Sequence, residues 1–409
     1  MFDLVDVLKN KNLDSVSSEE FKSVLFFQTE NCKDLVEEVF RFEGISPPRI
    51  IKNNEGDIRS HIREESAEII IIELNESTNV TKDIDHISSL LPNNASVIVI
   101  GQEDAISTIR NLKTMGFYYL FWPASKLDIV DFLNNVRDNR RRNFGLGKKR
   151  SAKRVAIWGS KGGVGTSLIV AEISKELSEK RNSSCLVMDS SFLGGNLDIM
   201  LGLKQFKKRH IALGALTASL DETYASSMTQ KVNDMLSLLA IESNELDNNQ
   251  MKDYSRELSN ELSHQVNFII EDLSNSNISQ SDFDYVALNI DTLIIVTEPS
   301  VSSVRAAANL IHQLEEKNSS VRCILIVNNV RPEKSATVSM SEIEKLLHKK
   351  INVECAYEQS LCDEILRGKS IYKQSFDISK KINIVTSLLL GEEPSLPKKN
   401  FLNRIFQSK

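Results

Sequence analysis

A chain of 409 residues is about twice as long as one ordinary domain, so its length favours two folded units. Apolar residues make up 41% of the sequence and charged residues 26%, which is typical of globular proteins and excludes wholesale disorder or a collagen-like fibre. The formal net charge of -6 and the pI near 5.7 exclude a generally basic surface for unselective DNA binding. Any contact with nucleic acid is therefore expected to be local.

The sequence contains no sign of a disulfide framework, a zinc site or a membrane-spanning helix. The cysteines include no C-x-x-C pair, which favours a reducing cytosol; they are Cys32, Cys185, Cys323, Cys355 and Cys362. No apolar run reaches the roughly 18 to 20 residues that a spanning helix needs, and the acidic N-terminal sequence is unlike a signal peptide. We expect a cytoplasmic protein that contacts a membrane only peripherally.

Short β-branched or aromatic runs alternate with helix-like stretches in the first third of the chain. The predicted strands are residues 24–27, 49–51, 68–72, 97–100 and 118–121. This alternation is typical of a parallel sheet covered by helices, so we predict a small flavodoxin-like domain over residues 1–140.

The composition changes between residues 137 and 154, where nine basic residues accompany two glycines. We interpret residues 141–153 as a basic linker. Its charges could meet phosphates of nucleic acid or anionic lipid, although a solvated linker is the simpler interpretation because no aromatic residue alternates with them. Nucleic acid is therefore not an expected partner.

A second α/β unit is predicted over residues 154–392. Its predicted strands are residues 154–158, 185–188, 268–270, 292–296 and 323–327, and a helix is predicted over 166–180. The intervals leave room for crossover helices, which predicts a doubly wound, mostly parallel sheet.

A glycine-rich turn lies directly between the first strand and the first helix of this unit, where a phosphate-binding loop belongs. Backbone N–H groups of such a loop, together with the helix N-terminus, bind anionic oxygens; the residues concerned are Gly162, Gly163, Val164, Gly165, Thr166 and Ser167. In the pattern G-x-x-x-x-G-K-[ST], however, the later lysine is replaced here by Thr166.

The loop sequence K-G-G-V-G-T-S resembles the deviant Walker A motif of the MinD/ParA-like ATPases. The resemblance implies a nucleotide-sandwiched homodimer in which Lys161 reaches the partner's phosphates, and it implies that Ser167 coordinates Mg²⁺. A small residue at the position of Thr166 looks like the TadZ/CpaE family of pilus assembly proteins.

Further motifs follow in the order of that superfamily and extend the resemblance over residues 154–390. Asp189, Asn196 and Asp198 match the motif D-x-D-x-x-x-x-N-x-D, whereas Ser191 replaces its second aspartate. Because the resemblance places that aspartate near the attacking water, its replacement predicts slow hydrolysis.

The later motifs add one acidic residue and one asparagine to the expected nucleotide site. Asp272 ends an apolar strand as in a Walker B motif and would hold Mg²⁺ through water. Residues 294–305 look like the strand-Pro-helix element of the MinD/ParA-like ATPases, and Asn328 occupies the position of an adenine-contacting asparagine. The resemblance assigns catalytic roles to Lys161, Asp189 and Asp272.

The first unit resembles a two-component receiver domain that has lost its chemistry. The positions of the acidic pair, the phosphoaccepting aspartate and the lysine carry Gln28-Thr29-Glu30, Glu73 and Trp122-Pro123. Without these groups an acyl phosphate cannot form. Glu73 could mimic the phosphorylated state, but we favour a solvated carboxylate at the end of a strand.

The C-terminal segment 393–409 is predicted to be an amphipathic helix. Its apolar side chains share one helical face; they are Phe401, Leu402, Ile405 and Phe406. A small membrane anchor and a docking segment for protein are equally good interpretations.

These features together predict an ATP-binding, dimerising localisation or assembly factor of the TadZ/CpaE kind, with Mg²⁺ as its metal and weak ATPase activity. Its expected partners are Tad-type (Flp) pilus or secretion proteins, including a secretion ATPase, at the inner membrane and its pole. The alternative is an active ParA-like ATPase in DNA segregation or another positioning system. A metal-cluster carrier of the same fold would need paired cysteines, which the sequence lacks.

Overall fold

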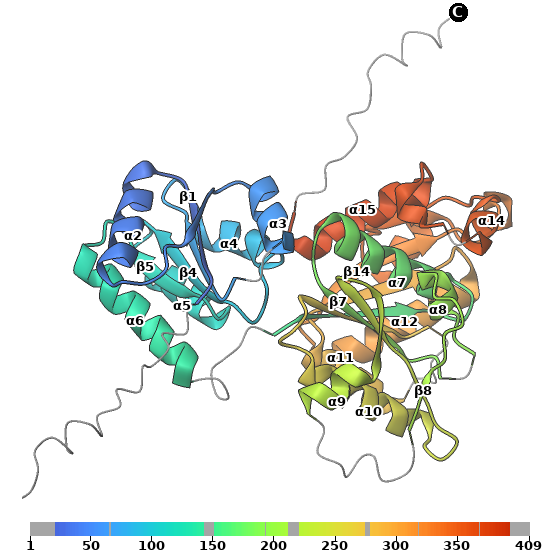
Figure 1. Cartoon of the computed structure of the whole chain (residues 1–409). Coiled ribbons are helices and arrows are strands. Elements are labelled where there is room, and N and C mark those ends of the chain that lie inside the picture. The colour runs from blue at the N-terminus through green and yellow to red at the C-terminus, as the bar shows by residue number, and fades with distance from the viewer. Residues whose placement is uncertain are drawn as a thin grey trace, which may run out of the picture. The chain divides into compact units, whose positions relative to one another are not determined.

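The computed structural model describes residues 21–64, 67–142, 151–192, 194–211, 221–274, 279–317, 319–367 and 369–392 (Figure 1). The chain divides into two compact units, Met1–Ile87 with Asn94–Arg150 and Ser88–Asn93 with Ser151–Lys409. Most of the predicted linker and the amphipathic segment 393–409 lie outside the described residues.

The first unit is built on a parallel sheet in the order β2-β1-β3-β4-β5. Its strands are β1 (Ser23–Phe27), β2 (Arg49–Lys52), β3 (Ile69–Glu73), β4 (Ser96–Gly101) and β5 (Tyr118–Phe121). All of the strands predicted for this unit are present, and their order is the flavodoxin-like one. The central strand β3 is wholly buried, because both faces of a parallel sheet are covered by helices.

The helices of this unit are α2 (Glu30–Phe42), α3 (Glu55–Glu64), α4 (Val80–Ser88), α5 (Ile106–Thr114) and α6 (Lys126–Arg142). Helix α2 begins after Thr29, whose hydroxyl accepts a hydrogen bond from the Cys32 N–H. Helix α6 extends to Arg142, so it includes the first two residues of the segment 141–153 that was interpreted as a linker. Just before that segment, the Arg140 guanidinium donates to the Asn94 carbonyl at 2.9 Å, within the first unit.

The second unit contains an eight-stranded sheet in the order β15-β14-β13-β6-β12-β7-β10-β9. Its strands are β6 (Lys153–Gly159), β7 (Cys185–Asp189), β9 (Thr229–Asn233), β10 (Leu236–Leu239), β12 (Phe268–Asp272), β13 (Thr292–Thr297), β14 (Arg322–Asn328) and β15 (Val353–Cys355). Only β9 runs antiparallel to its neighbour within this sheet. Strands β8 (Arg209–His210) and β11 (Ile241–Glu242) form a separate small pair.

Helices cover both faces of this sheet. One face packs against α7 (Thr166–Lys175), the π-turn Glu176–Lys180, α8 (Leu197–Leu201) and α15 (Asp377–Leu390). The other face packs against α9 (Glu222–Ser227), α10 (Asn248–Glu261), α11 (Gln280–Asn289), α12 (Val301–Glu316) and α13 (Met340–Leu347). The remaining helical pieces are Glu333–Ser335, α14 (Leu361–Leu366) and Ile371–Lys373. The predicted doubly wound, mostly parallel architecture is therefore confirmed.

The connections reverse direction at β6, because β7 and β10 lie on one side of it while β13, β14 and β15 lie on the other. Ligands of open α/β sheets bind at the carboxyl ends of strands at such a reversal. The glycine-rich turn directly follows β6 and therefore lies at this point. Among the helices of the described ranges, none has the length and apolarity to cross a membrane.

Candidate nucleotide site

The candidate site lies where β6, β7, β12, β13 and β14 end. Gly159 at the end of β6 is the register partner of Val296 on β13, and the Ser160 N–H donates to the Val296 carbonyl at 2.8 Å. On the other side, Asp272 of β12 is the register partner of Ile157 of β6 and of Asp189 of β7. The sheet therefore brings the loop and both predicted acids to one edge.

The loop between β6 and α7 is held by close backbone approach. Gly165 has a φ of 89°, a left-handed conformation that favours glycine, and a side chain there would collide with the Asn328 amide. The Asn328 Nδ2 atom donates to the Val164 carbonyl at 2.8 Å and is buried. Asn328 thus fixes the shape of the loop, a role that the resemblance did not suggest. Gly162 and Gly163 are exposed at the loop.

Thr166, at the position of the missing lysine, offers no cation to this loop. The side chain is 3% exposed, and its hydroxyl lies where a side chain on Gly159 would have to be. A threonine is also too short to reach a phosphate as a lysine does, so the charge at this point of the loop is lost.

Ser167 opens α7 beside Asp272. The Ser167 hydroxyl is 2.8 Å from the Ser274 hydroxyl, and the Ser274 N–H donates to Asp272 Oδ1 at 2.9 Å. Asp272 is completely buried, and its Oδ2 atom has no hydrogen-bond partner among the described residues. Burial raises the pKa of Asp272 to about 6, and the Asp189 carboxylate adds to this rise, whereas hydrogen bonds with Ser167 and Ser274 oppose it.

These two side chains fit a magnesium ion. An unpartnered buried carboxylate oxygen is costly without a cation, and hydroxyl and carboxylate oxygens are the donors that Mg²⁺ prefers. Ser167 and Asp272 are therefore the residues that would hold the ion, directly or through water.

Asp189 pairs with a basic residue, Lys208, that lies outside the motifs. Its Oδ1 atom accepts from the Ser191 N–H at 2.9 Å, and Lys208 Nζ lies 3.4 Å from its Oδ2. The same ammonium donates to the Ser191 carbonyl at 2.7 Å. Burial raises the pKa of Asp189, although the charge of Lys208 opposes this. Lys208 lies in the basic run K-K-R-H, and this run was the only sequence signal that could have indicated a cation near Asp189.

The other members of this motif are less enclosed. Ser191 is 4% exposed and presents no carboxylate. Asn196 is exposed just before α8, where its side chain makes no capping hydrogen bond, and Asp198 is half-buried in the first turn of that helix.

Lys161 is paired within its own chain. Its Nζ atom lies 2.5 Å from Glu298 Oε1, at the end of β13. Burial would raise the pKa of Glu298, but hydrogen bonds from Lys161 and Ser300 outweigh this effect and lower it. Residues 294–305 were expected to form a strand-Pro-helix element, and nothing in their sequence pointed to Glu298 as a partner of the lysine.

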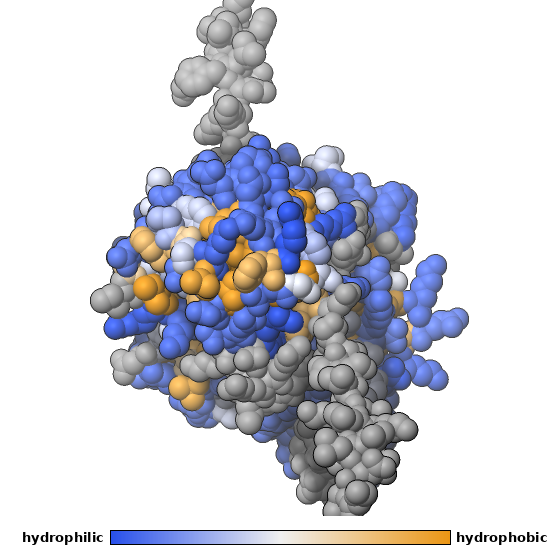
Figure 2. Space-filling view, turned by 60° about the vertical axis from the view of Figure 1, so that its left-hand side comes forward, coloured by the Kyte–Doolittle hydropathy of each residue, from blue (hydrophilic) through white to orange (hydrophobic). Residues whose placement is uncertain are grey.

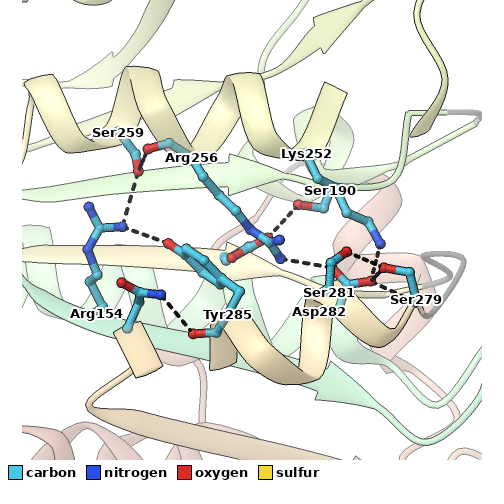
Figure 3. A network of polar contacts seen from close by, with 11 residues as sticks. Arg154, Ser190, Lys252, Arg256, Ser259, Ser279, Ser281, Asp282 and Tyr285 are labelled. Carbon is cyan, nitrogen blue, oxygen red and sulfur yellow. Dashed lines mark hydrogen bonds and ion pairs between the residues drawn. The ribbon is translucent and has the colours of Figure 1, made fainter. Parts of the chain in front are cut away.

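A buried ionic network lies on the opposite face of β12 from Asp272 (Figure 3). Glu271 Oε1 accepts from Arg256 Nη2 at 2.9 Å and from the Ser190 hydroxyl at 3.1 Å. Asp282 binds the same Arg256 atom at 3.0 Å and Lys252 Nζ at 2.7 Å. Two cations therefore balance two carboxylates, all at most 5% exposed as side chains. The pairing holds α10 and α11 against the strand that carries Asp272.

In the first unit, the structure corrects the prediction that Glu73 is a solvated carboxylate. Glu73 is completely buried rather than solvated. Its carboxylate accepts four hydrogen bonds, from Gln28 N at 2.6 Å, Thr29 N at 2.9 Å, Thr29 Oγ1 at 2.5 Å and Asn75 Nδ2 at 2.6 Å. The carboxylate therefore ties the end of β3 to the loop between β1 and α2, where solvation by water is replaced by N–H and O–H donors.

No protein-family model matches the chain. The chain is 25% identical over 248 residues to the septum site-determining protein MinD of Helicobacter pylori, covering 58% of this chain and 91% of that protein. Among solved structures, a ParA family ATPase from Chlorobium tepidum has 24% identity and a TM-score of 0.48, covering 58% of this chain and 99% of that one. The MinC:MinD cell division complex of Aquifex aeolicus has 27% identity and a TM-score of 0.48, covering 60% and 99%.

The sequence match and the fold support homology between the second unit and the MinD/ParA-family ATPases. The predicted P-loop ATPase architecture is thereby confirmed at the level of this superfamily. The narrower TadZ/CpaE relationship, the pilus role and the receiver relationship of the first unit stay predictions.

Proposed function

We propose that this protein binds ATP with Mg²⁺ in the second unit, dimerises around the nucleotide and hydrolyses it slowly. The observation that carries the proposal is that a glycine-rich loop before a helix lies beside a buried Asp272 oxygen that has no hydrogen-bond partner among the described residues. The backbone N–H groups of residues 162–167 would bind the phosphates, and the partial positive charge at the start of α7 would add to this attraction. A bound Mg²⁺ would neutralise phosphate charge at Ser167 and Asp272.

Lys161 would contact the phosphates of a second copy, as the family resemblance implies. Its side chain is 35% exposed, so it can be reached from outside the chain. Because Thr166 supplies no charge, this lysine is the cation that the loop itself can offer. Asn328 would contact the adenine while its Nδ2 atom continues to hold the Val164 carbonyl.

Slow turnover follows from two neutral residues. Thr166 removes a charge-assisted contact with phosphate, a contact worth about 1.5 to 3 kcal/mol. Ser191 removes the carboxylate that would orient or activate water. Lys208 donates to the adjacent Ser191 carbonyl and pairs with the Asp189 carboxylate, so Asp189 is not free to act as the base in place of the missing aspartate. The nucleotide-bound dimer would therefore be long-lived.

A long-lived dimer suits a protein that positions other proteins at one site in the cell. We propose that the chain positions a Tad-type pilus or a related secretion machine at the inner membrane, with machine components, including a secretion ATPase, as partners. The first unit would serve as a docking module, because Glu73 is locked by hydrogen bonds and cannot accept a phosphoryl group as an aspartate does.

Exposed apolar side chains of the first unit support docking to protein. Figure 2 shows orange residues grouped within a largely hydrophilic surface. Among the described residues of this unit, the large exposed apolar side chains are Phe42, Ile109, Phe121 and Leu127. Of these, Phe121 ends β5 and Leu127 lies in the first turn of α6, at one edge of the sheet, and exposed apolar residues that gather mark contact surfaces more often than single ones do.

Calorimetry and steady-state phosphate release test the proposal together. We expect ATP to bind only weakly without Mg²⁺, and we expect turnover below about 1 per second, the low end of ordinary enzymes. Absence of ATP binding in the presence of Mg²⁺, or turnover well above that rate, would contradict it.

A further inference from the structure

We propose that Glu298 is a positioning residue that controls how readily Lys161 leaves its own chain to contact the phosphate of a second copy. This inference rests on the proposed nucleotide-bound dimer. It adds that the lysine is not free before dimerisation but is exchanged between a carboxylate of its own chain and a phosphate of the partner.

The ion pair joins the two segments that flank the site. Lys161 Nζ and Glu298 Oε1 are 2.5 Å apart, which is within range of a charge-assisted hydrogen bond. The lysine side chain is 35% exposed, whereas the glutamate side chain is only 8% exposed. The lysine is therefore the member of the pair that can move, and the glutamate is the member that is fixed.

Neighbouring hydroxyl groups fix Glu298. Its backbone N–H donates to Ser303 Oγ at 3.1 Å, and its Oε1 atom accepts from Ser300 Oγ at 2.9 Å. Ser300 caps the N-terminus of α12, and the Ser303 hydroxyl lies 2.6 Å from the Ser160 hydroxyl of the loop. Because Glu298 is held both at its backbone N–H and at its carboxylate, the carboxylate cannot follow Lys161 outward, and the ion pair has to break.

The remaining charges make this exchange possible. When Lys161 leaves, Glu298 keeps the Ser300 hydrogen bond, and the positive charge of Arg331 also favours its ionised form. The lysine would gain phosphate oxygens, which carry more negative charge than one carboxylate. The exchange is therefore modest in free energy and depends on the phosphates being present.

The size of the effect follows from the stoichiometry. A partly exposed ion pair changes an equilibrium by about fivefold at most. One dimer breaks two such pairs, one in each chain, so the effect enters the dimer dissociation constant twice.

Light scattering of the full chain against protein concentration, with saturating Mg-ATP, tests the inference. We expect Glu298→Gln, which keeps the side-chain length and an oxygen for Ser300, to lower the dimer dissociation constant about tenfold. In a Lys161→Ala background, measured at the higher protein concentrations that this variant needs to dimerise, the same substitution should change nothing, because the two residues form one thermodynamic cycle.

A second measurement detects the ion pair without nucleotide. Reductive methylation followed by mass spectrometry should modify Lys161 faster in Glu298→Gln than in the parent, while an exposed lysine such as Lys345 should react equally in both. A merely structural role of Glu298 would lower the free energy of unfolding without changing this ratio.

The outcomes separate the two proposals. Equal dissociation constants for parent and Glu298→Gln, or an equal effect of the substitution in the Lys161→Ala background, would overturn the inference while leaving the dimer intact. Absence of a dimer in the parent at saturating Mg-ATP would overturn the proposed function and the inference with it.

Discussion

Asp272 and Asp189 are register partners on the adjacent parallel strands β12 and β7, and both are buried. Lys208 lies 3.4 Å from Asp189, whereas no basic side chain in the described ranges pairs with Asp272. Because two neighbouring carboxylates share only one positive charge, the pair favours the binding of a second cation. This relationship is the electrostatic basis of the proposed magnesium site.

Removal of the Ser167 hydroxyl should make ATP binding less dependent on Mg²⁺. We expect Ser167→Ala to weaken ATP binding in Mg²⁺ about tenfold, a typical effect of losing one good polar contact, with little change in EDTA. Calorimetry in both buffers measures the difference. Ser174→Ala, which removes a buried hydroxyl bonded within α7 to the Val170 carbonyl, is the matched control. Equal losses in both buffers would contradict a metal-binding role.

The raised pKa of Asp272 predicts a pH dependence of stability. The raised pKa means that folded Asp272 holds its proton up to about pH 6, whereas the unfolded chain releases it near the ordinary aspartate pKa of 3.8. Stability from this group is therefore present below the unfolded pKa and is lost as the pH rises through the folded one. Asp272→Asn should avoid this loss. The free energy of unfolding of the variant should therefore rise relative to that of the parent by about 2 to 3 kcal/mol between pH 4 and pH 7.

Urea unfolding in EDTA measures this advantage. A Trp122→Phe background leaves Trp158, which is buried in the second unit, as the reporting fluorophore. Asp363→Asn provides an exposed carboxyl control in the same unit. A difference between Asp272→Asn and the parent that stays constant with pH, or that shrinks as the pH rises, would count against a buried ionised Asp272.

Restoring the missing carboxylate should raise turnover. We expect Ser191→Asp to increase steady-state phosphate release at least about tenfold, because a positioned base commonly contributes two to four orders of magnitude. Ser191→Asn has nearly the same size without the charge and should turn over like the parent. If both variants behave alike, the slow rate has another cause than the residue at position 191.

The hydrogen bonds that the Glu73 carboxylate accepts should stabilise the first unit. Glu73→Ala leaves the N–H groups of Gln28 and Thr29 without the acceptor that they have in the structure, and each unsatisfied buried group costs about 1 to 3 kcal/mol. We expect the free energy of unfolding to fall by about 3 kcal/mol. Urea unfolding in a Trp158→Phe background, with Trp122 as fluorophore and the exposed Glu76→Ala as control, measures this. A loss no greater than that of Glu76→Ala would show that the contacts are not stabilising.

The sequence predicted those elements whose signals are local. Runs such as residues 69–72 and 292–296 are long and β-branched, and the structure contains strands there. Strand β9 carries the polar sequence TQKVN on an antiparallel edge, and β15 has only 3 residues, so neither has a local signal that distinguishes it from a loop.

The contacts that define the site are long-range, and periodicity does not reveal them. Glu73 is buried against its hydrogen-bond donors Gln28 and Thr29, which lie 45 and 44 residues earlier in the chain, so no local pattern predicts the contact. The pairing of Lys161 with Glu298 likewise depends on β6 and β13 being neighbours in the sheet. The motifs located the residue types, and the topology determined which of them meet.

Light scattering of the intact chain with and without Mg-ATP tests the central claim most directly. We predict a mass of twice the 46.1 kDa chain with Mg-ATP and of one chain without nucleotide, with Lys161→Ala remaining a single chain at concentrations where the parent is a dimer. A parent that stays a single chain at saturating Mg-ATP, or a Lys161→Ala variant that dimerises like the parent, would contradict a nucleotide-bound dimer closed by this lysine.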